Sequence, residues 1–495
     1  MKRASFRRKP ESSLIDRSVL DTGLRRYDVP AVRAFTVILF VLTVTSCASA
    51  PEVDAPDLPF DVPAAWAGDK GANAGTPRDQ WWRDFNDELL NKYVDEAFAN
   101  NPGLEVAAAR IDAASALARI AGAGELPELI GGFRAQRQQQ IFTGIPTPSG
   151  APLKSRADTF GLSLDLSWEL DLWGRVRSEH AAALADVEAS VADYHGARLL
   201  LAAHVVKAYV LVYDAQTQLQ IAEESLASAQ SVVSTVERRF NAGTRGAIDV
   251  SFAKSDEATL RAAIEQRKQA LDASRRALEV FLGRYPAGAI EVTEDLIMLP
   301  QSPPVGLPAG VVARRPDLIA AECRLAAALQ RVDAADAALY PRIALTASAG
   351  TTSNELEDLL DGDFSVWSIA GNLLQPIFNN GRLTAAVDLA DARQAELMAN
   401  YANTALTAFF EVERALAAQA YVVNQNAALR EASMQAERAL GLAQSRYESG
   451  TGDILSVLEA QRRSLQARSQ LASLDRACSE IRVELHLALG GGFGG

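Results

Sequence analysis

Residues 160–169 read Phe-Gly-Leu-Ser-Leu-Asp-Leu-Ser-Trp-Glu, and this stretch decides the class of the fold. Every even-numbered position carries a large apolar side chain, and every odd-numbered position carries a small or polar one. Because successive side chains of a β-strand point to opposite faces, such a strand has one apolar and one polar face. This alternation is typical of a strand that crosses a membrane between lipid and a water-filled lumen. One face of a soluble β-sandwich would produce the same pattern.

Three further segments are candidate strands. Residues 343–349 alternate in the same way, and residues 129–137 and 363–370 alternate more weakly. A sheet in hydrocarbon must close on itself, because each unpaired backbone group there costs several kcal/mol, and the smallest single-chain barrels have about eight strands. Four strands cannot close, so we expect several copies to share one barrel, with three copies supplying twelve strands.

Long helices make up most of the remaining chain. Residues 172–240 and 380–448 contain no proline and are rich in strong helix formers. A helix of this length is on the order of 100 Å long, which favours a coiled-coil-like shaft over a globular domain. Shorter helices should follow at 249–283, with Asp249 as the N-cap, and at 453–489. On these residues alone, a soluble coiled-coil bundle remains an alternative.

The helices belong to an internal repeat. Residues 237–243 (ERRFNAG) match residues 444–450 (QSRYESG) at an offset of 207, and segments around Arg110 and Arg324 match at an offset of 214. Self-similarity of this kind indicates a duplicated structural unit. Each half therefore predicts a helix, two short strands and a long helical hairpin.

The N-terminus predicts export and a lipid anchor. Residues 34–44 are an apolar run of 11, which suits a signal peptide and is too short to span a membrane. Small residues then lead to Cys47, as in a bacterial lipoprotein box, so we expect cleavage before Cys47 and lipid on this residue. Ala48 in the next position is typical of lipoproteins sent to the outer membrane. An ordinary signal peptide or a buried helix is the alternative.

Charge and composition exclude several classes of protein. The chain of 495 residues has a formal net charge of −13, and removal of residues 1–46 makes it −18, which argues against nucleic acid as a partner. No run reaches the roughly 18 apolar residues of a membrane-spanning helix, so a helical inner-membrane protein is not expected. Asp165, Glu169 and Asp171 should line a polar lumen wall rather than act in catalysis. The histidines lack the spacing of metal ligands. We expect no enzymatic activity, no metal and no cofactor apart from the lipid.

Several segments together resemble a known family. They are Trp81-Trp82-Arg83-Asp84-Phe85, residues 167–175 (SWELDLWGR), Arg314-Arg315-Pro316-Asp317, Tyr340-Pro341-Arg342-Ile343, residues 446–450 (RYESG) and residues 458–462 (LEAQR). The pattern resembles the TolC-like outer-membrane efflux factors, specifically their lipoprotein (OprM/NodT-like) branch, from residue 79 to residue 493. The resemblance implies a mainly α fold with a small β part. It implies a homotrimer with a shared 12-stranded outer-membrane barrel, four strands per chain, and a long α-helical periplasmic tunnel.

The resemblance also implies a function and its residues. The chain would be the outer-membrane channel component of a tripartite efflux pump, a passive conduit that exports small molecules such as drugs. Its partners would be a periplasmic adaptor and an inner-membrane transporter of the resistance-nodulation-division class. Leu455 and Glu459 would face the pore as the periplasmic gate, and Tyr447 would help to hold the gate hairpin shut. Glu459 stands where the family usually has Asp. A leucine ring can dewet a pore, and an acidic ring favours cations.

Alternatives remain for the residues and for the function. Glu459 could be an ordinary solvated helix charge, and Tyr447 could simply pack at a turn. The outer-membrane conduit of a type I protein secretion system would share the fold, and a non-channel helical structural lipoprotein would share the helices. The expected organisation is a leader and signal peptide (1–46), a lipidated extended tether (47–78), a first repeat (79–285), a connector (286–316), a second repeat (317–490) and a Gly-rich tail (491–495).

Overall fold

The computed structural model describes residues 58–67, 80–144, 152–293, 305–306 and 308–491. Cys47 and the whole expected leader, 1–46, lie outside the described residues. Residues 50–495 form one compact unit, and every element described below belongs to it.

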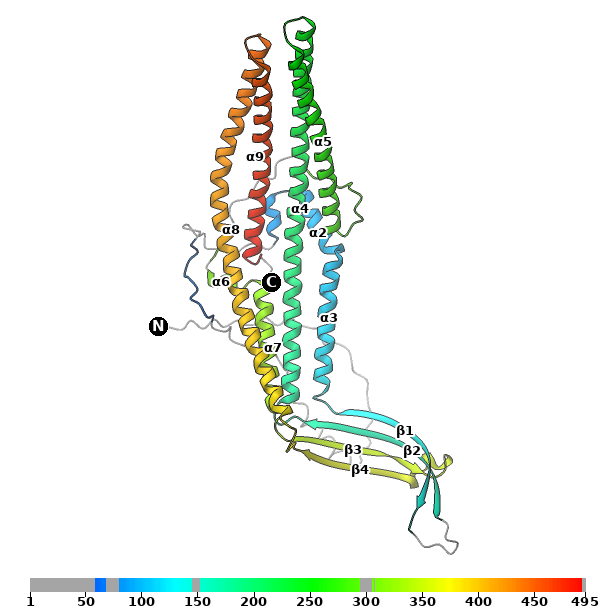
Figure 1. The fold of residues 1–495 in the computed structure, drawn as a ribbon. Coiled ribbons are helices and arrows are strands. Elements are labelled where there is room, and N and C mark those ends of the chain that lie inside the picture. The colour runs from blue at the N-terminus through cyan, green and yellow to red at the C-terminus, as the bar shows by residue number, and fades with distance from the viewer. Residues whose placement is uncertain (1–57, 68–79, 145–151, 294–304, 307, 492–495) are drawn as a thin grey trace, which may run out of the picture. The chain divides into compact units, whose positions relative to one another are not determined.

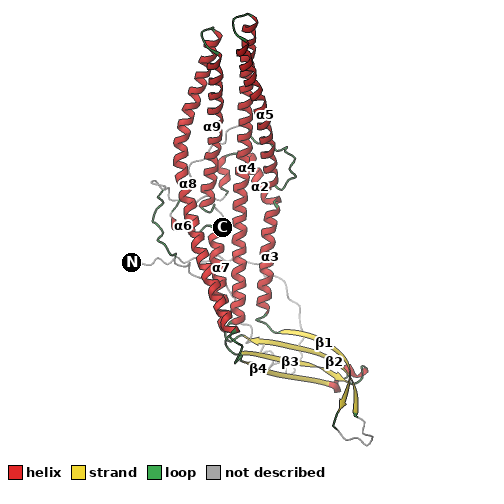
Figure 2. Cartoon of the chain, in the orientation of Figure 1, coloured by secondary structure: helices red, strands yellow, loops and turns green. Residues whose placement is uncertain are grey.

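The chain runs through helices, a pair of strands and a pair of long helices, twice (Figures 1 and 2). The helices are η1 (Trp81–Phe85), α2 (Glu88–Asn100), α3 (Pro102–Ala123), α4 (Arg175–Asn241), α5 (Ala247–Phe281), α6 (Pro308–Val312), α7 (Pro316–Ala337), η2 (Glu357–Leu360), η3 (Gly362–Phe364), α8 (Arg382–Glu448) and α9 (Ile454–Ala488). The strands are β1 (Glu128–Phe142), β2 (Leu153–Leu170), β3 (Arg342–Ser353) and β4 (Ser365–Leu374). All four predicted strands and all four predicted long helices are confirmed, whereas η1, α2, α6, η2 and η3 were not predicted.

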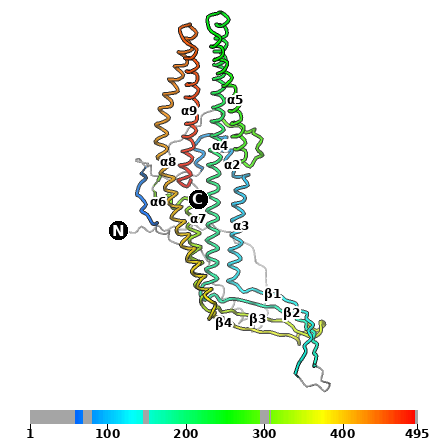
Figure 3. Tube along the Cα trace, viewed as in Figure 1, coloured from blue at the N-terminus to red at the C-terminus, as the bar shows by residue number. Residues whose placement is uncertain are grey.

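The internal repeat is visible in the lengths of the helices. Both α4 and α8 contain 67 residues, both α5 and α9 contain 35, and both α3 and α7 contain 22. The starts of α4 and α8 are 207 residues apart, and the starts of α3 and α7 are 214 apart, as the sequence offsets predict. The difference of seven falls in the strand region, where β1 and β2 are longer than β3 and β4. The two long hairpins run side by side in Figure 3.

Helix α4 is the centre of the bundle, because it packs against α3, α5, α7 and α9. It also corrects one expectation from the sequence. An 18-residue window of α4 has a mean hydropathy of 1.4, so by length and composition it could cross a membrane. In the described structure 56% of this window is buried. Its apolar residues, among them Val205, Val206 and Val212, form a core with η1 and α2.

The prediction that Asp249 caps the second helix is wrong. Helix α5 begins at Ala247, its N-cap is Gly246, and Asp249 lies in its first turn. A carboxylate in the first turn is still favourable, because it faces the partial positive charge of the helix N-terminus. The signal in the sequence was therefore correct for a helix start and displaced by three residues.

The four strands form one antiparallel sheet in the order β1-β2-β3-β4, which lies beyond the ends of the long helices in Figure 1. Residues paired across neighbouring strands share a face. One row of paired residues is Leu129, Leu166, Ala347 and Ile369, and the next is Ile130, Asp165, Ser348 and Ser368. In these rows the apolar and polar faces predicted for residues 160–169 continue onto β3 and β4, whereas β1 places the apolar Ile130 on the polar face.

The polar face of the sheet has its own hydrogen bonds. The Asp165 carboxylate accepts hydrogen bonds from Ser163 Oγ at 2.8 Å and from Ser348 Oγ at 2.6 Å. Asp171 was expected to line the lumen wall with Asp165 and Glu169, but β2 ends at Leu170, so strand alternation does not assign Asp171 to the polar face. Asp171 instead accepts a hydrogen bond from the backbone N–H of Arg177, 2.9 Å away, in the first turn of α4.

Residues 58–67, part of the expected tether, contain no helix or strand but are held against the second repeat. Trp66 is 4% exposed, donates from Nε1 to the carbonyl of Gly306 at 3.1 Å and lies 6.0 Å from the ring of Phe409. The next backbone N–H, of Ala67, donates to Glu413 at 2.7 Å. This part of the chain is therefore fastened to α8.

A buried histidine joins η1 to the end of α9. The rings of His486 and Trp81 are stacked with 5.0 Å between their centroids, and His486 is 2% exposed. Neither ring nitrogen of His486 has a hydrogen-bond partner among the described residues. Burial lowers the pKa of His486 to about 3, and the charge of Arg482 adds to this effect. The histidine is therefore held neutral.

We expect the stability of the folded protein to fall in acid because of His486. An unfolded histidine has a pKa of about 6.5, so between that pH and about 3 the unfolded chain binds a proton that the folded chain does not. The free energy of unfolding should drop as the pH is lowered through this window, by up to ~1.4 kcal/mol per pH unit. Thermal unfolding of the detergent-solubilised protein and of His486→Leu at a series of pH values measures this. The His486→Leu variant should lose the part of the stability decrease that His486 causes in acid. Equal slopes of stability against pH in the two proteins would contradict the neutral, buried state assigned to His486.

Candidate functional site at the hairpin turns

The two long hairpins end in turns that lie close together, at residues 242–246 between α4 and α5 and at residues 449–453 between α8 and α9. Two glycines shape the second turn. Gly450 has φ +81°, the left-handed conformation that glycine adopts without strain. Gly452 approaches the backbone so closely that a Cβ there would lie 2.8 Å from the backbone nitrogen of Tyr447. The predicted glycine stop is therefore part of a tight turn.

Tyr447 lies at the junction of the two hairpins and is 2% exposed. The guanidinium of Arg239 lies 4.6 Å from the centre of its ring, and that of Arg245 lies 5.6 Å away. Arg239 also donates to the carbonyl of Glu448 at 2.7 Å, and Arg245 donates to the carbonyl of Gly452 at 2.9 Å. Both arginines thus reach from the first hairpin to the second, and we refer to Arg239, Arg245 and Tyr447 as the turn clasp.

Apolar packing beneath the turn clasp fixes the start of α9. The buried cluster takes residues from both hairpins: Val232, Val233, Val236, Ala253, Tyr447, Ile454, Val457 and Leu458. Within α9 the buried positions 454, 457 and 458 leave Leu455 and Glu459 on the opposite side of the helix. Leu455 is therefore 53% exposed, although the residue before it, Ile454, is buried.

Glu459 is paired within its own helix. One carboxylate oxygen accepts from Arg462 at 2.5 Å, and the other accepts from Arg463 at 2.7 Å. The hydrogen bond from Arg463 and the charges of both arginines hold the pKa of Glu459 below its usual value. The carboxylate is thus ionised at neutral pH, and two guanidinium groups surround its charge.

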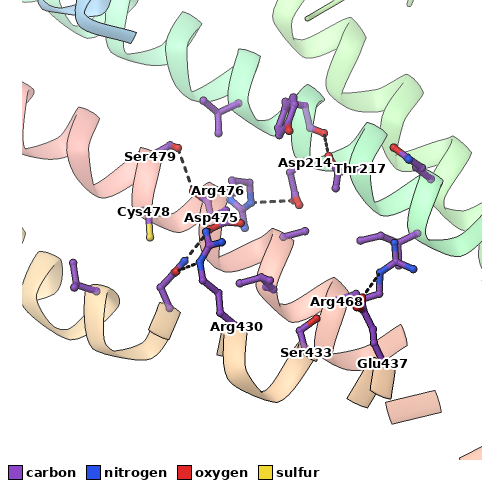
Figure 4. Close-up of a pocket in the computed structure, with 18 residues that line it drawn as sticks. Asp214, Thr217, Arg430, Ser433, Glu437, Arg468, Asp475, Arg476, Cys478 and Ser479 are labelled. Carbon is purple, nitrogen blue, oxygen red and sulfur yellow. Dashed lines mark hydrogen bonds and ion pairs between the residues drawn. The ribbon is translucent and has the colours of Figure 1, made fainter. Parts of the chain in front are cut away.

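A cavity of about 550 Å³ lies between α4, α8 and α9, away from the turns (Figure 4). Neither Leu455, Glu459 nor Tyr447 lines it. Ion pairs across the cavity link α9 to both neighbouring helices: Arg476 with Asp214 (3.2 Å), Arg430 with Asp475 (3.3 Å) and Arg468 with Glu437 (3.6 Å). Since these charges are paired, the cavity belongs to the packing of the two hairpins.

The sequence analysis identified Tyr447, Leu455 and Glu459 and missed the arginines that contact them. The structure brings Tyr447 together with Arg239 and Arg245 but places Leu455 and Glu459 on a different, exposed face. The repeat could have indicated Arg239, because residues 237–243 align with the segment that contains Tyr447. Nothing in the sequence pattern assigns Arg245 to the second turn, since that contact is made across 207 residues.

We expect the turn clasp to hold the second turn rigid. Replacing both arginines (Arg239→Gln with Arg245→Gln) removes two hydrogen bonds and two cation–π contacts, the latter worth ~0.5–1 kcal/mol each at exposed sites. Amide hydrogen exchange at Gly450–Gly452 should become about tenfold faster, as a loss of ~1.4 kcal/mol implies. Mass spectrometry of the deuterated peptide measures this rate.

Three variants test the origin of that effect. Tyr447→Phe should leave the exchange rate nearly unchanged, because the aromatic ring, which phenylalanine retains, makes the cation–π contacts with Arg239 and Arg245. Tyr447→Ala should match the double arginine variant. Arg238→Gln is the control, because Arg238 bonds only to Thr235 of its own helix among the described contacts. An equal acceleration in the control would show that charge loss alone, rather than the turn clasp, loosens the turn.

Comparison with known proteins identifies the family. The family model described as outer membrane efflux protein matches residues 93–284 and 307–491. The pyoverdine export outer membrane protein OpmQ of Pseudomonas putida is 33% identical over 442 residues, covering 88% of this chain and 93% of the relative. The toluene efflux pump outer membrane protein TtgF of Pseudomonas putida is 33% identical, with 92% and 96% covered.

A solved structure shows the same fold. The outer-membrane channel OprN superposes with a TM-score of 0.82 at 28% identity, covering 90% of this chain and 99% of that one. The predicted fold, with long helices and four strands in two repeats, is thereby confirmed as that of a TolC-like channel. The chain belongs to the outer membrane efflux protein family and is an efflux channel of the outer membrane.

Proposed function

We propose that three copies of this chain form one passive conduit, which receives small molecules from a periplasmic adaptor and an inner-membrane transporter of the resistance-nodulation-division class. The observation that carries this proposal is the four-stranded sheet, which has an apolar and a polar face and two free edges, β1 and β4. Placed in lipid, those edges need partners. Pairing β1 of one copy with β4 of the next satisfies both edges and leaves the polar faces around a common lumen.

The number of copies follows from the size of a closed barrel. Two copies would give eight strands, and side chains fill the interior of a barrel of that size, whereas three copies give twelve strands and leave room for a lumen. Unheated protein in mild detergent should migrate in gel electrophoresis as one trimer-sized species and after heating as a monomer. A monomer under both conditions would contradict the shared barrel.

The kind of cargo is proposed from the relatives. Their names refer to the export of pyoverdine and the efflux of toluene, and these two small molecules differ in chemistry. This similarity supports export of small molecules within a tripartite pump and favours it over protein secretion. Because the relatives differ from one another, a specific compound cannot be transferred to this chain.

We further propose that the second hairpin is the periplasmic gate. Leu455 would form the apolar ring of the pore, Glu459 would lie one turn further along, and Tyr447 with its two arginines would hold the hairpin inward. Leu455 is 53% exposed at the start of α9 and, among the described residues, is not part of the buried cluster that fixes this end of the helix. Opening would release the turn clasp and move α8 and α9 outward, a shift between two packings of the same helices.

We expect Leu455→Ala to raise the single-channel conductance of the purified protein in planar bilayers, because a smaller side chain widens an apolar constriction and lets it fill with water. The matched control is Leu442→Ala on α8, because Leu442 is also largely exposed (59%) but lies outside the first turns of α9. Breaking the turn clasp with Arg239→Gln and Arg245→Gln should raise the open probability. Conductance unchanged by Leu455→Ala would remove the gate assignment while leaving the channel itself in place.

We also propose that Cys47 carries lipid. The support is the apolar run at 34–44 followed by small residues and the cysteine. Labelled palmitate should be incorporated into the wild-type chain and lost in Cys47→Ala. Acyl chains contribute ~0.8 kcal/mol per buried methylene, so several on one residue give a durable anchor. Equal labelling of the two proteins would contradict the proposal.

A further inference from the structure

The first three turns of α9 expose a single stripe of side chains. The stripe consists of Leu455, Ser456, Glu459, Arg462, Arg463 and Gln466, and we call it the α9 stripe. The other side of the helix is buried at positions 454, 457, 458, 460, 461 and 464. Residues seven apart on a helix differ by only about 20° in direction. Leu455 and Arg462 therefore point in nearly the same direction, about 10 Å apart along the helix, so a pore that runs along this face of α9 would meet both.

The charge of the α9 stripe is positive. It contains one carboxylate and two guanidinium groups, and both oxygens of Glu459 are taken by Arg462 and Arg463. The arginine side chains are 67% and 73% exposed, whereas that of Glu459 is 45% exposed. The guanidinium groups thus extend further into solvent than the carboxylate that they neutralise.

Neighbouring acids do not reverse this sign on the exposed side. Asp256 of α5 interacts with Arg462 and lines a small cavity together with it, so this acid offsets part of the charge of Arg462, whereas Arg463 does not line that cavity. Burial also raises the pKa of Asp256. Although the whole chain carries a net charge of −13, the turn segments 237–249 and 444–466 together hold six basic and five acidic residues.

We propose that the α9 stripe makes the constriction of this channel selective for anions, so that its cargo class is negatively charged small molecules. The proposal rests on the gate position proposed for Leu455 and reverses the expectation of a cation-favouring acidic ring. In three copies the six guanidinium groups would surround a narrow lumen. A ring of arginine raises the local concentration of anions and opposes cations.

The experiment is the reversal potential of single channels of the full-length protein in a KCl gradient across a planar bilayer. Wild type should prefer chloride. Arg462→Gln with Arg463→Gln should shift the reversal potential toward potassium, and Arg462→Lys with Arg463→Lys should keep the wild-type preference because the charge is retained. Glu459→Gln should strengthen the preference for chloride. If an acidic ring set the selectivity instead, wild type would prefer potassium and Glu459→Gln would lose that preference.

The matched control removes the same charge elsewhere. Arg261→Gln with Lys268→Gln neutralises two basic residues on an exposed face of α5 and should leave the reversal potential unchanged. A cation-selective wild type, or a selectivity unaffected by the α9 variants, would overturn the inference. Failure of the proposed gate has a different signature, because Leu455→Ala would then leave the conductance unchanged whatever the selectivity.

Discussion

A backbone N–H or C=O group that enters hydrocarbon without a partner costs several kcal/mol, and this constraint governs the whole molecule. The sheet satisfies its inner strands by pairing β1 to β2, β2 to β3 and β3 to β4, but β1 and β4 remain as edges. A single chain therefore carries a membrane-suited surface that it cannot complete. A shared barrel explains both the alternation of apolar and polar residues in the strands and the presence of only four strands per chain, since each chain contributes one segment of a common wall.

The helical repeat meets a second requirement, which is to hold two hairpins of equal length in register. Equal helix lengths bring the two turns to the same level, so that residues of the α4–α5 turn can contact the α8–α9 turn. At these turns the two halves have diverged. Phe240 occupies the repeat position of Tyr447, yet Phe240 is 43% exposed and Tyr447 is 2% exposed. The first hairpin supplies the two arginines and the second supplies the aromatic ring. The two copies of the repeat therefore differ at their turns and fit each other there.

Local patterns predicted the elements of this fold well. Alternation gave the strands, helix-forming composition gave the long helices, and the 207-residue offset gave their pairing. The failures share a cause, which is that they depend on how elements meet. The window in α4 is apolar because the helix is covered by four neighbours. Asp171 leaves the sheet because β2 ends one residue earlier and α4 needs a partner for its first backbone N–H groups.

The candidate site was predicted in the same partial way. Family motifs located Tyr447, Leu455 and Glu459 along the chain, and the helix period is enough to place Leu455 and Glu459 on one face. The charge around them could not be read from the motif. Arg462 and Arg463 are adjacent in sequence to the predicted gate, but their pairing with both oxygens of Glu459 emerges only from side-chain geometry.

Because Trp66 is held against α8, the segment between Cys47 and Trp66 limits how far Cys47 can lie from this helix. Eighteen residues lie between Cys47 and Trp66, and even a fully extended chain over these 19 steps reaches only about 65 Å. Glu413, which holds the next residue, Ala67, lies 31 residues into α8 from its sheet end, or about 47 Å along the helix. If Cys47 carries the proposed lipid, the segment between Cys47 and Trp66 is at most slightly longer than this distance along α8. Shortening that segment by several residues would then pull either the acyl chains from the membrane or Trp66 from its contact with Phe409.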